Sequence, residues 1–164
     1  MPKHILSILV ENQSGVLGRV TGLFSRRGYN IESLSVGVTE NENLSRITVV
    51  VNGDDYILGQ ITKQLEKQVV VEKIIELGQE TSVKRELMLI KVKTTEKNKM
   101  MIFETVNVFR AKIIDLSIDS LTIEITGTPD KVESFIELLK PYGILEIART
   151  GLTGLERGST TINN

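Results

Sequence analysis

Cysteine is absent from this chain of 164 residues, aromatic residues make up 4% of it, and histidine occurs once, as His4. Without cysteine there are no disulfides, thiolate metal ligands or cysteine nucleophiles, which favours a cytoplasmic location. The formal net charge of -1 gives no basic excess and no sign of an obligatory nucleic-acid partner. No apolar run approaches the length of a membrane span, and the run near the N-terminus is too short for a secretory signal.

The composition that remains is 40% hydrophobic and 25% charged, which is ordinary for one compact domain or two small ones. In the first half, branched apolar runs predict strands and a 3.6-residue apolar period predicts helices. The order is strand, helix, strand, strand, helix, strand: the ferredoxin-like βαββαβ arrangement of an α+β fold. Both helices then cover one face of a four-stranded antiparallel sheet, and something else must cover the apolar residues on its other face.

The same pattern begins again after a polar break, so the sequence predicts two tandem ferredoxin-like βαββαβ domains. Helix ends are marked in both halves. Gly28 follows a predicted helix at about 15–27, and Thr128 with Pro129 opens the last helix as N-cap and first residue. The expected divisions are a domain at 1–78, a linker at 79–82, a domain at 83–158 and a disordered tail at 159–164.

Residues able to carry catalysis are few. The single histidine, His4, lies at the start of a strand with no partner nearby in the sequence, which favours a structural or exposed role. The adjacent carboxylates of Asp54 and Asp55 fall at a helix start, where they suit the helix dipole better than a metal ion. No nucleophile-elbow, zincin or P-loop pattern occurs. The sequence therefore predicts no catalytic residue and no metal site.

The stretch "ENQSGVLGRV" offers the clearest candidate for a ligand site. Gly18 and Gly22 lie inside a predicted helix and are most simply explained by close packing. Gly15 lies at the helix N-terminus, where unpaired backbone N–H groups can bind a carboxylate. Asn12 before the helix and Asn30 after it can hydrogen-bond a ligand. Taken alone, Asn12 is better explained as a turn or cap residue, and its pairing with Asn30 is what favours a ligand site.

Two other functions fit this topology. RNA-recognition domains share βαββαβ but use aromatic residues on their central strands, and the third strand here, "LSRITVVV", has none. An assembly module without a ligand remains open.

Five stretches resemble the regulatory (small) subunit of acetolactate synthase, also called acetohydroxyacid synthase. They are "LVENQSGVLGRVTGLFSRRGYNIESLSV", "LSRITVVV", "RELMLIKV", "FRAKIID" and "ILEIARTGLTGLERG", in that order. The helix-start glycine after the first strand is the general mark of ACT domains, which are small amino-acid-binding modules. The resemblance covers nearly the whole chain and implies that the first domain is an ACT domain.

The resemblance also implies a homodimer that binds a branched-chain amino acid, usually valine, between its ACT domains. A separate large catalytic subunit would use thiamine diphosphate, Mg2+ and FAD to make acetolactate. The small chain, itself without cofactor or catalysis, would activate that subunit and confer feedback inhibition. A stand-alone amino-acid sensor is the second hypothesis.

Carried over to this sequence, the effector site combines residues from two copies of the chain. Gly18 departs from many relatives, which carry a polar residue there beside the site. Backbone N–H groups near the helix start would bind the ligand carboxylate, the two asparagines its polar ends, and the apolar residues its side chain. The expected site residues are Asn12, Gly15, Val16 and Leu17 of one copy with Asn30 and Ile31 of the other.

Overall fold

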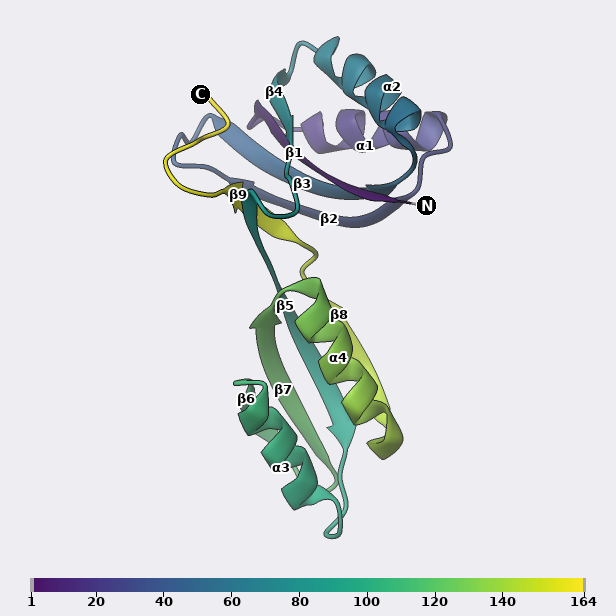
Figure 1. Ribbon diagram of the computed structural model, residues 1–164, viewed down its shortest axis with the longest axis vertical. Helices are drawn as coiled ribbons and strands as arrows, with labels where there is room; N and C mark the ends of the chain where they lie inside the picture. Colours follow the sequence, from purple (N-terminus) through teal and green to yellow (C-terminus); the bar gives the residue numbers. More distant parts are fainter. Residues whose placement is uncertain (1, 164) are drawn as a thin grey trace. The chain divides into compact units, whose positions relative to one another are not determined.

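A computed structural model describes residues 2–163, which form two compact units (Figure 1). The first unit contains the residues up to Val83 and also those from Leu152 onward. The second contains Lys84–Gly151. The chain therefore leaves the first unit, builds the second, and returns to complete the first.

The first unit has the predicted βαββαβ order. Its sheet is antiparallel with the strand order β2-β3-β1-β4, so β2 and β4 are its edges. Figure 1 shows both helices on the same face of this sheet. The elements are β1 (Lys3–Glu11), α1 (Val16–Arg26), β2 (Ile31–Val38), β3 (Leu44–Asn52), α2 (Asp55–Glu66) and β4 (Val71–Glu76).

Local sequence explains where the helices of the first unit begin and end. Gly15 precedes α1 with φ 83°, and Gly28 follows its C-cap with φ 72°, left-handed conformations that glycine adopts without strain. Asp54 is the N-cap of α2, where its carboxylate accepts a 2.9 Å hydrogen bond from the Ile57 amide. Alternate residues of β1 and β3 pack against Val20 and Phe24 of α1 to form the core.

The opposite face of this sheet is also buried. Ser7, Thr48 and Val50 alternate with core residues and so point away from the helices, yet each is at most 7% exposed. The residues after Gly151, drawn in yellow in Figure 1, return beside this sheet. They bury Leu152 and Ile162, each 4% exposed, and add the strand β9 (Thr153–Glu156), which pairs with β5. This returning segment supplies part of the cover that the sequence pattern required, and the Arg46 side chain, which donates to the Ser7 hydroxyl at 2.7 Å, supplies another part.

The second unit repeats the topology with the strand order β6-β7-β5-β8. Its core is built around Phe135, whose ring lies 5.1 Å from that of Phe109 between centroids. Thr128 caps α4 as predicted, by accepting a hydrogen bond from the Lys131 amide. The elements are β5 (Ser82–Lys93), α3 (Lys99–Val108), β6 (Lys112–Leu116), β7 (Ser120–Gly127), α4 (Pro129–Leu139), the 3-10 turn η1 (Lys140–Tyr142) and β8 (Ile144–Arg149).

The contacts divide the chain differently from the boundaries expected at 79–82 and 158. β5 is continuous across the expected start of the second domain because the polar break ends at the strand and does not interrupt it. The segment after Gly151 joins the first unit because its apolar side chains are buried there. Ile162 is among them, so the expected tail at 159–164 is not disordered at that residue; its last residue lies outside the described range.

Candidate functional site

The N-terminus of α1 presents unpaired backbone donors. The Val16 amide donates to the Gln13 carbonyl at 3.4 Å, and the Arg19 amide to the Gly15 carbonyl at 3.1 Å. Between them, the amides of Leu17 and Gly18 have no acceptor among the residues that the structure describes. These N–H groups, at the positive end of an 11-residue helix, suit a carboxylate or another small anion.

Asn12 ties this helix start to the turn between β2 and β3. Its backbone amide donates to the Asn43 carbonyl at 2.7 Å and its side-chain Nδ2 to the Glu42 carbonyl at 2.9 Å. Its Oδ1 accepts from the Ser45 hydroxyl at 3.2 Å. Asn12 therefore has a structural role at this corner and keeps one side-chain N–H for a further acceptor. Sequence reasoning missed these partners because they lie about thirty residues away.

The two apolar residues expected beside Gly15 face opposite ways. Val16 is 4% exposed and packs in the core of the first unit. Leu17 is 38% exposed. The helix start therefore offers one apolar side chain, that of Leu17, next to the free backbone donors.

The residues expected from the second copy do not meet this corner within one chain. Asn30 and Ile31 follow the C-terminal end of α1, whereas Gly15 precedes its N-terminal end. An α-helix rises 1.5 Å per residue, so these ends lie roughly 16 Å apart. Asn30 is exposed and its side chain has no hydrogen bond within residues 2–163; Ile31 is half-buried at the start of the edge strand β2.

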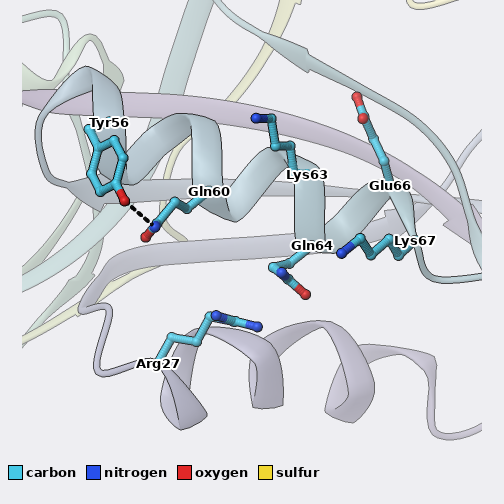
Figure 2. A pocket seen from close by; sticks show the side chains of 7 residues that line it. All are labelled: Arg27, Tyr56, Gln60, Lys63, Gln64, Glu66 and Lys67. Atoms are coloured by element: carbon cyan, nitrogen blue, oxygen red, sulfur yellow. Dashed lines mark hydrogen bonds between the residues drawn. The ribbon is translucent and has the colours of Figure 1, made fainter.

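A separate hollow of about 530 Å³ lies along α2 (Figure 2). Tyr56 and Gln60 are joined there by a 2.9 Å hydrogen bond, and Tyr29 donates to the other end of the Gln60 amide at 2.8 Å. The hollow contains none of the predicted site residues. Its lining side chains are Arg27, Tyr56, Gln60, Lys63, Gln64, Glu66 and Lys67.

The single histidine has a partner that the sequence did not reveal. The ring Nδ1 of His4 lies 2.7 Å from a Glu76 carboxylate oxygen, and its Nε2 lies 3.9 Å from Asp55. Glu76 is on β4, which β1 pairs with across the sheet. Residues 2–163 contain no group of three or more His, Asp or Glu side chains placed to hold a metal ion, and none of their helices is long and apolar enough to cross a membrane.

The four-stranded antiparallel βαββαβ sheet of the first unit is ferredoxin-like, and the free backbone donors at the start of its first helix fit the ACT class of regulatory domains. Comparison with known families agrees. Residues 6–73 match the AHAS small subunit-like ACT domain, and residues 85–158 match the family described as the small subunit of acetolactate synthase.

Whole-chain relatives carry the same description. The acetolactate synthase small subunit of Mycolicibacterium smegmatis is 54% identical over 157 residues, covering 96% of this chain and 92% of the relative. That of Bacillus subtilis is 48% identical over 158 residues, with 96% and 92% covered. A crystal structure of the small subunit from Thermotoga maritima superposes with a TM-score of 0.90 at 44% identity, covering 98% of this chain and all of the other. The chain belongs to the family of acetolactate synthase small subunits. Membership of this small-subunit family, with its ACT-type domain, implies a regulatory role and a large catalytic partner.

Proposed function

We propose that this chain activates the separate catalytic subunit of acetolactate synthase and makes the enzyme subject to feedback inhibition by valine. The activity belongs to branched-chain amino acid biosynthesis in the cytoplasm. The thiamine diphosphate, Mg2+ and FAD used in the chemistry would bind to the catalytic partner. The free backbone donors of Leu17 and Gly18 at the start of α1 are the observation that carries the proposal.

The carboxylate of valine fits these donors. Its two oxygens would accept from the Leu17 and Gly18 amides, where the helix dipole adds a favourable interaction with negative charge. The remaining side-chain N–H of Asn12 is held at the same corner by the bonds to the β2–β3 turn. These donors would thus bind the carboxylate of any amino acid, and the side chain of the ligand would be selected by other contacts.

A second copy of the chain would complete the site through β2. This strand is a sheet edge with exposed Val36 and Val38, and antiparallel pairing of two β2 strands would extend the sheet. Such pairing brings the start of one β2 beside the end of the other. The end of β2 leads into the turn that Asn12 holds, so Asn30 and Ile31 of the second copy would face the helix start.

The side chains at this junction favour a branched apolar ligand. Leu17 of one copy and Ile31 of the other are the apolar groups available, and neither can pair with a polar or charged side chain. Leu17 is exposed in the single chain, so a small apolar ligand side chain would cover it on binding. Valine, leucine and isoleucine all satisfy this chemistry.

Inhibition follows if valine binds one conformation of the holoenzyme more tightly than another. Such coupling changes affinities by about 5–150-fold in known allosteric proteins. Activation and inhibition are then separable, because only inhibition needs the effector site.

The test compares Asn30→Ala with Asn107→Ala, an exposed asparagine of the second unit. We expect Asn30→Ala to weaken valine binding and inhibition at least tenfold while activation of the catalytic subunit stays within about twofold, consistent with loss of hydrogen bonds to a charged ligand. Asn107→Ala should change neither. Calorimetry with valine and assays of the reconstituted holoenzyme measure both. If Asn30→Ala abolished activation as well as inhibition, with circular dichroism unchanged, the separation of roles would be contradicted.

A further inference from the structure

Two serines of β2 hold the returning segment by its backbone. The Ser35 hydroxyl donates to the Leu152 carbonyl at 2.9 Å, and the Leu152 amide donates to the Ser33 hydroxyl at 3.0 Å. Both backbone groups of Leu152 are therefore satisfied by side chains more than a hundred residues away in the sequence. These three residues, Ser33, Ser35 and Leu152, are called the serine clamp below.

The serine clamp holds the point where the chain re-enters the first unit. Leu152 is the first residue of the returning segment, and Gly151 before it is the last of the second unit. Gly151 has φ 86°, a conformation that glycine tolerates and other residues resist. On its other side, the Thr150 amide donates to the Leu87 carbonyl at 3.0 Å and so fixes the chain to β5. Leu152 is thus followed back into the second unit by Gly151 and the hydrogen-bonded Thr150.

A β-bulge separates the serine clamp from the proposed effector residues. Ile31 pairs with Val51 of β3 and Ser33 with Val50, so Glu32 is an extra residue in β2. The Glu32 carboxylate pairs with Lys3 at 2.7 Å. Bulges bend a strand and re-aim its side chains, and they occur often beside functional sites. The bulge thus lies where a displacement of Ile31 can alter the position of Ser33.

We propose that the serine clamp transmits effector occupancy from β2 to the second unit. The inference rests on the proposed function, because it takes Asn30 and Ile31 as effector contacts. When valine draws these residues against the partner copy's helix start, the bulge adjusts and the two hydroxyl bonds to Leu152 strengthen. A ligand shifts such an equilibrium only by its differential affinity for the two arrangements, so clamp and effector site must favour each other reciprocally.

The buried surroundings allow the clamp to change without unfolding the first unit. Leu152 is 4% exposed and stays anchored by its side chain, while the two hydroxyl bonds involve half-buried serines. Hydroxyl bonds of this kind are individually modest, so they can be exchanged for water while apolar packing persists.

The test uses the holoenzyme with the double variant Ser33→Ala/Ser35→Ala. We expect valine still to bind with its affinity lowered about fivefold, activation to be retained, and the inhibition at saturating valine to fall by about half or more, because loss of the clamp removes the coupling between the effector site and the second unit. Thr62→Ala is the matched control, because Thr62 also donates from a half-buried side chain to a backbone carbonyl, that of Leu58, at 2.9 Å. It should leave inhibition unchanged.

Hydrogen exchange adds a readout that a purely structural clamp would not move. In the unaltered holoenzyme, valine should change the exchange rate of the Leu152 amide at least fivefold, as coupling of this kind requires. Ser33→Thr, which keeps the hydroxyl, should preserve inhibition. Should the double variant fail to fold, the exchange measurement on the unaltered holoenzyme decides alone.

The outcomes separate the two proposals. If valine binds and inhibits but the Leu152 amide does not respond and the double variant is inhibited normally, the clamp is structural only and the inference is overturned while the proposed function stands. If valine does not bind the unaltered chain, the proposed function fails and the inference fails with it.

Discussion

The sheet of the first unit buries Ser7 and Thr48 on the face away from its helices, whereas the corresponding face of the second unit carries Lys91, Thr122 and Glu146. Lys91 and Glu146 form an ion pair at 3.4 Å across β5 and β8, with their side chains 41% and 73% exposed. Ser7 and Thr48 are at most 1% exposed. The two units thus share a topology but differ at the sheet face away from the helices. In the first unit the chain's own C-terminal segment helps to cover this face, and in the second unit the face is exposed to solvent.

The units also differ at the residue after the C-cap of their first helix. In both, the chain turns through a left-handed residue, Gly28 at φ 72° and Arg110 at φ 54°. The hydrogen bonds are the same: Tyr29 donates to Phe24, and Ala111 to Val106, each at 2.9 Å. Glycine adopts this conformation freely, but an L-residue such as Arg110 adopts it at a cost of roughly 1–2 kcal/mol. Shared geometry therefore does not require shared sequence.

Deleting everything after Gly151 should give the largest effect. The first unit would lose the burial of Leu152 and Ile162, each contributing about 1.5–3 kcal/mol, so its free energy of unfolding should fall by about 3–6 kcal/mol. Hydrogen exchange of β1 and β3 amides should accelerate, while exchange in β7 should not. Unchanged protection of β1 and β3 would show that the returning segment is not their cover.

Single leucine-to-alanine substitutions also test the difference between the covered sheet face of the first unit and the exposed face of the second. Leu152→Ala should destabilise the first unit by about 2–4 kcal/mol because it leaves a cavity against the buried sheet face. Leu145→Ala, on β8 of the second unit and 53% exposed, should change stability by less than about 0.5 kcal/mol. Urea unfolding monitored separately in each unit measures both. Equal losses for the two variants would contradict the distinction.

The second unit has its own buried polar contact. Arg149 donates to Glu133 at 2.7 Å and, through Nε, to the buried carboxylate of Glu86 at 3.1 Å. Burial lowers the pKa of Arg149, but Glu133 and Glu86 outweigh it and hold the pKa above its ordinary value, so the guanidinium stays charged. Arg149→Ala should cost about 1–3 kcal/mol by leaving Glu86 without its cation.

Adding Glu86→Gln to the Arg149→Ala chain should recover part of that loss, since a neutral amide is less costly to bury than an unpaired carboxylate. Thermal unfolding of the single and double variants forms the cycle. A double variant less stable than Arg149→Ala would refute this role for the pair.

The smallest effects concern the left-handed residues. Gly28→Ala should destabilise the first unit by about 1 kcal/mol, and Arg110→Gly should stabilise the second by about 0.5–1 kcal/mol. A Cβ on residue 28 would have no atom within 4 Å, so the cost of Gly28→Ala comes from the backbone conformation and not from a steric clash. Denaturant midpoints of the two variants should shift in opposite directions. Shifts of the same sign would contradict the explanation of both stability changes by the left-handed backbone conformation.

Features set by neighbouring residues were predictable from the sequence. The βαββαβ order, the Asp54 and Thr128 caps and the terminal Gly28 depend on residues within one helix turn. The return of the chain to the first unit was not predictable, because the partners of Leu152 lie more than a hundred residues away. The apolar side chains of the returning segment also follow no strand or helix period. The left-handed conformation of Arg110 was not predictable either, because arginine has no preference for positive φ.

The candidate site was predictable only in part. Gly15 could be placed at a helix N-terminus from the pattern before it, and the structure agrees. The burial of Val16 and the turn-holding bonds of Asn12 depend on how α1 rests on the sheet, which no local pattern reveals. That Asn30 lies a full helix away from Gly15 follows from the length of α1 and is the reason why the proposed site takes Asn30 from a second copy.

Complementation between two defective chains tests the shared site most directly. Leu17→Asp replaces the apolar side chain proposed to contact the ligand with a negative charge that repels the nearby ligand carboxylate, at a helix start that tolerates acidic residues, and Asn30→Ala removes the contact from the other copy. Each variant alone should bind valine at least about tenfold more weakly than the unaltered chain, as measured by calorimetry at valine concentrations that saturate the unaltered site. Mixed and re-associated in equal amounts, they should regain about a quarter of the sites, because half of the dimers would be mixed and each would hold one intact site. A mixture that binds no more valine than either variant alone would contradict a site built from two copies.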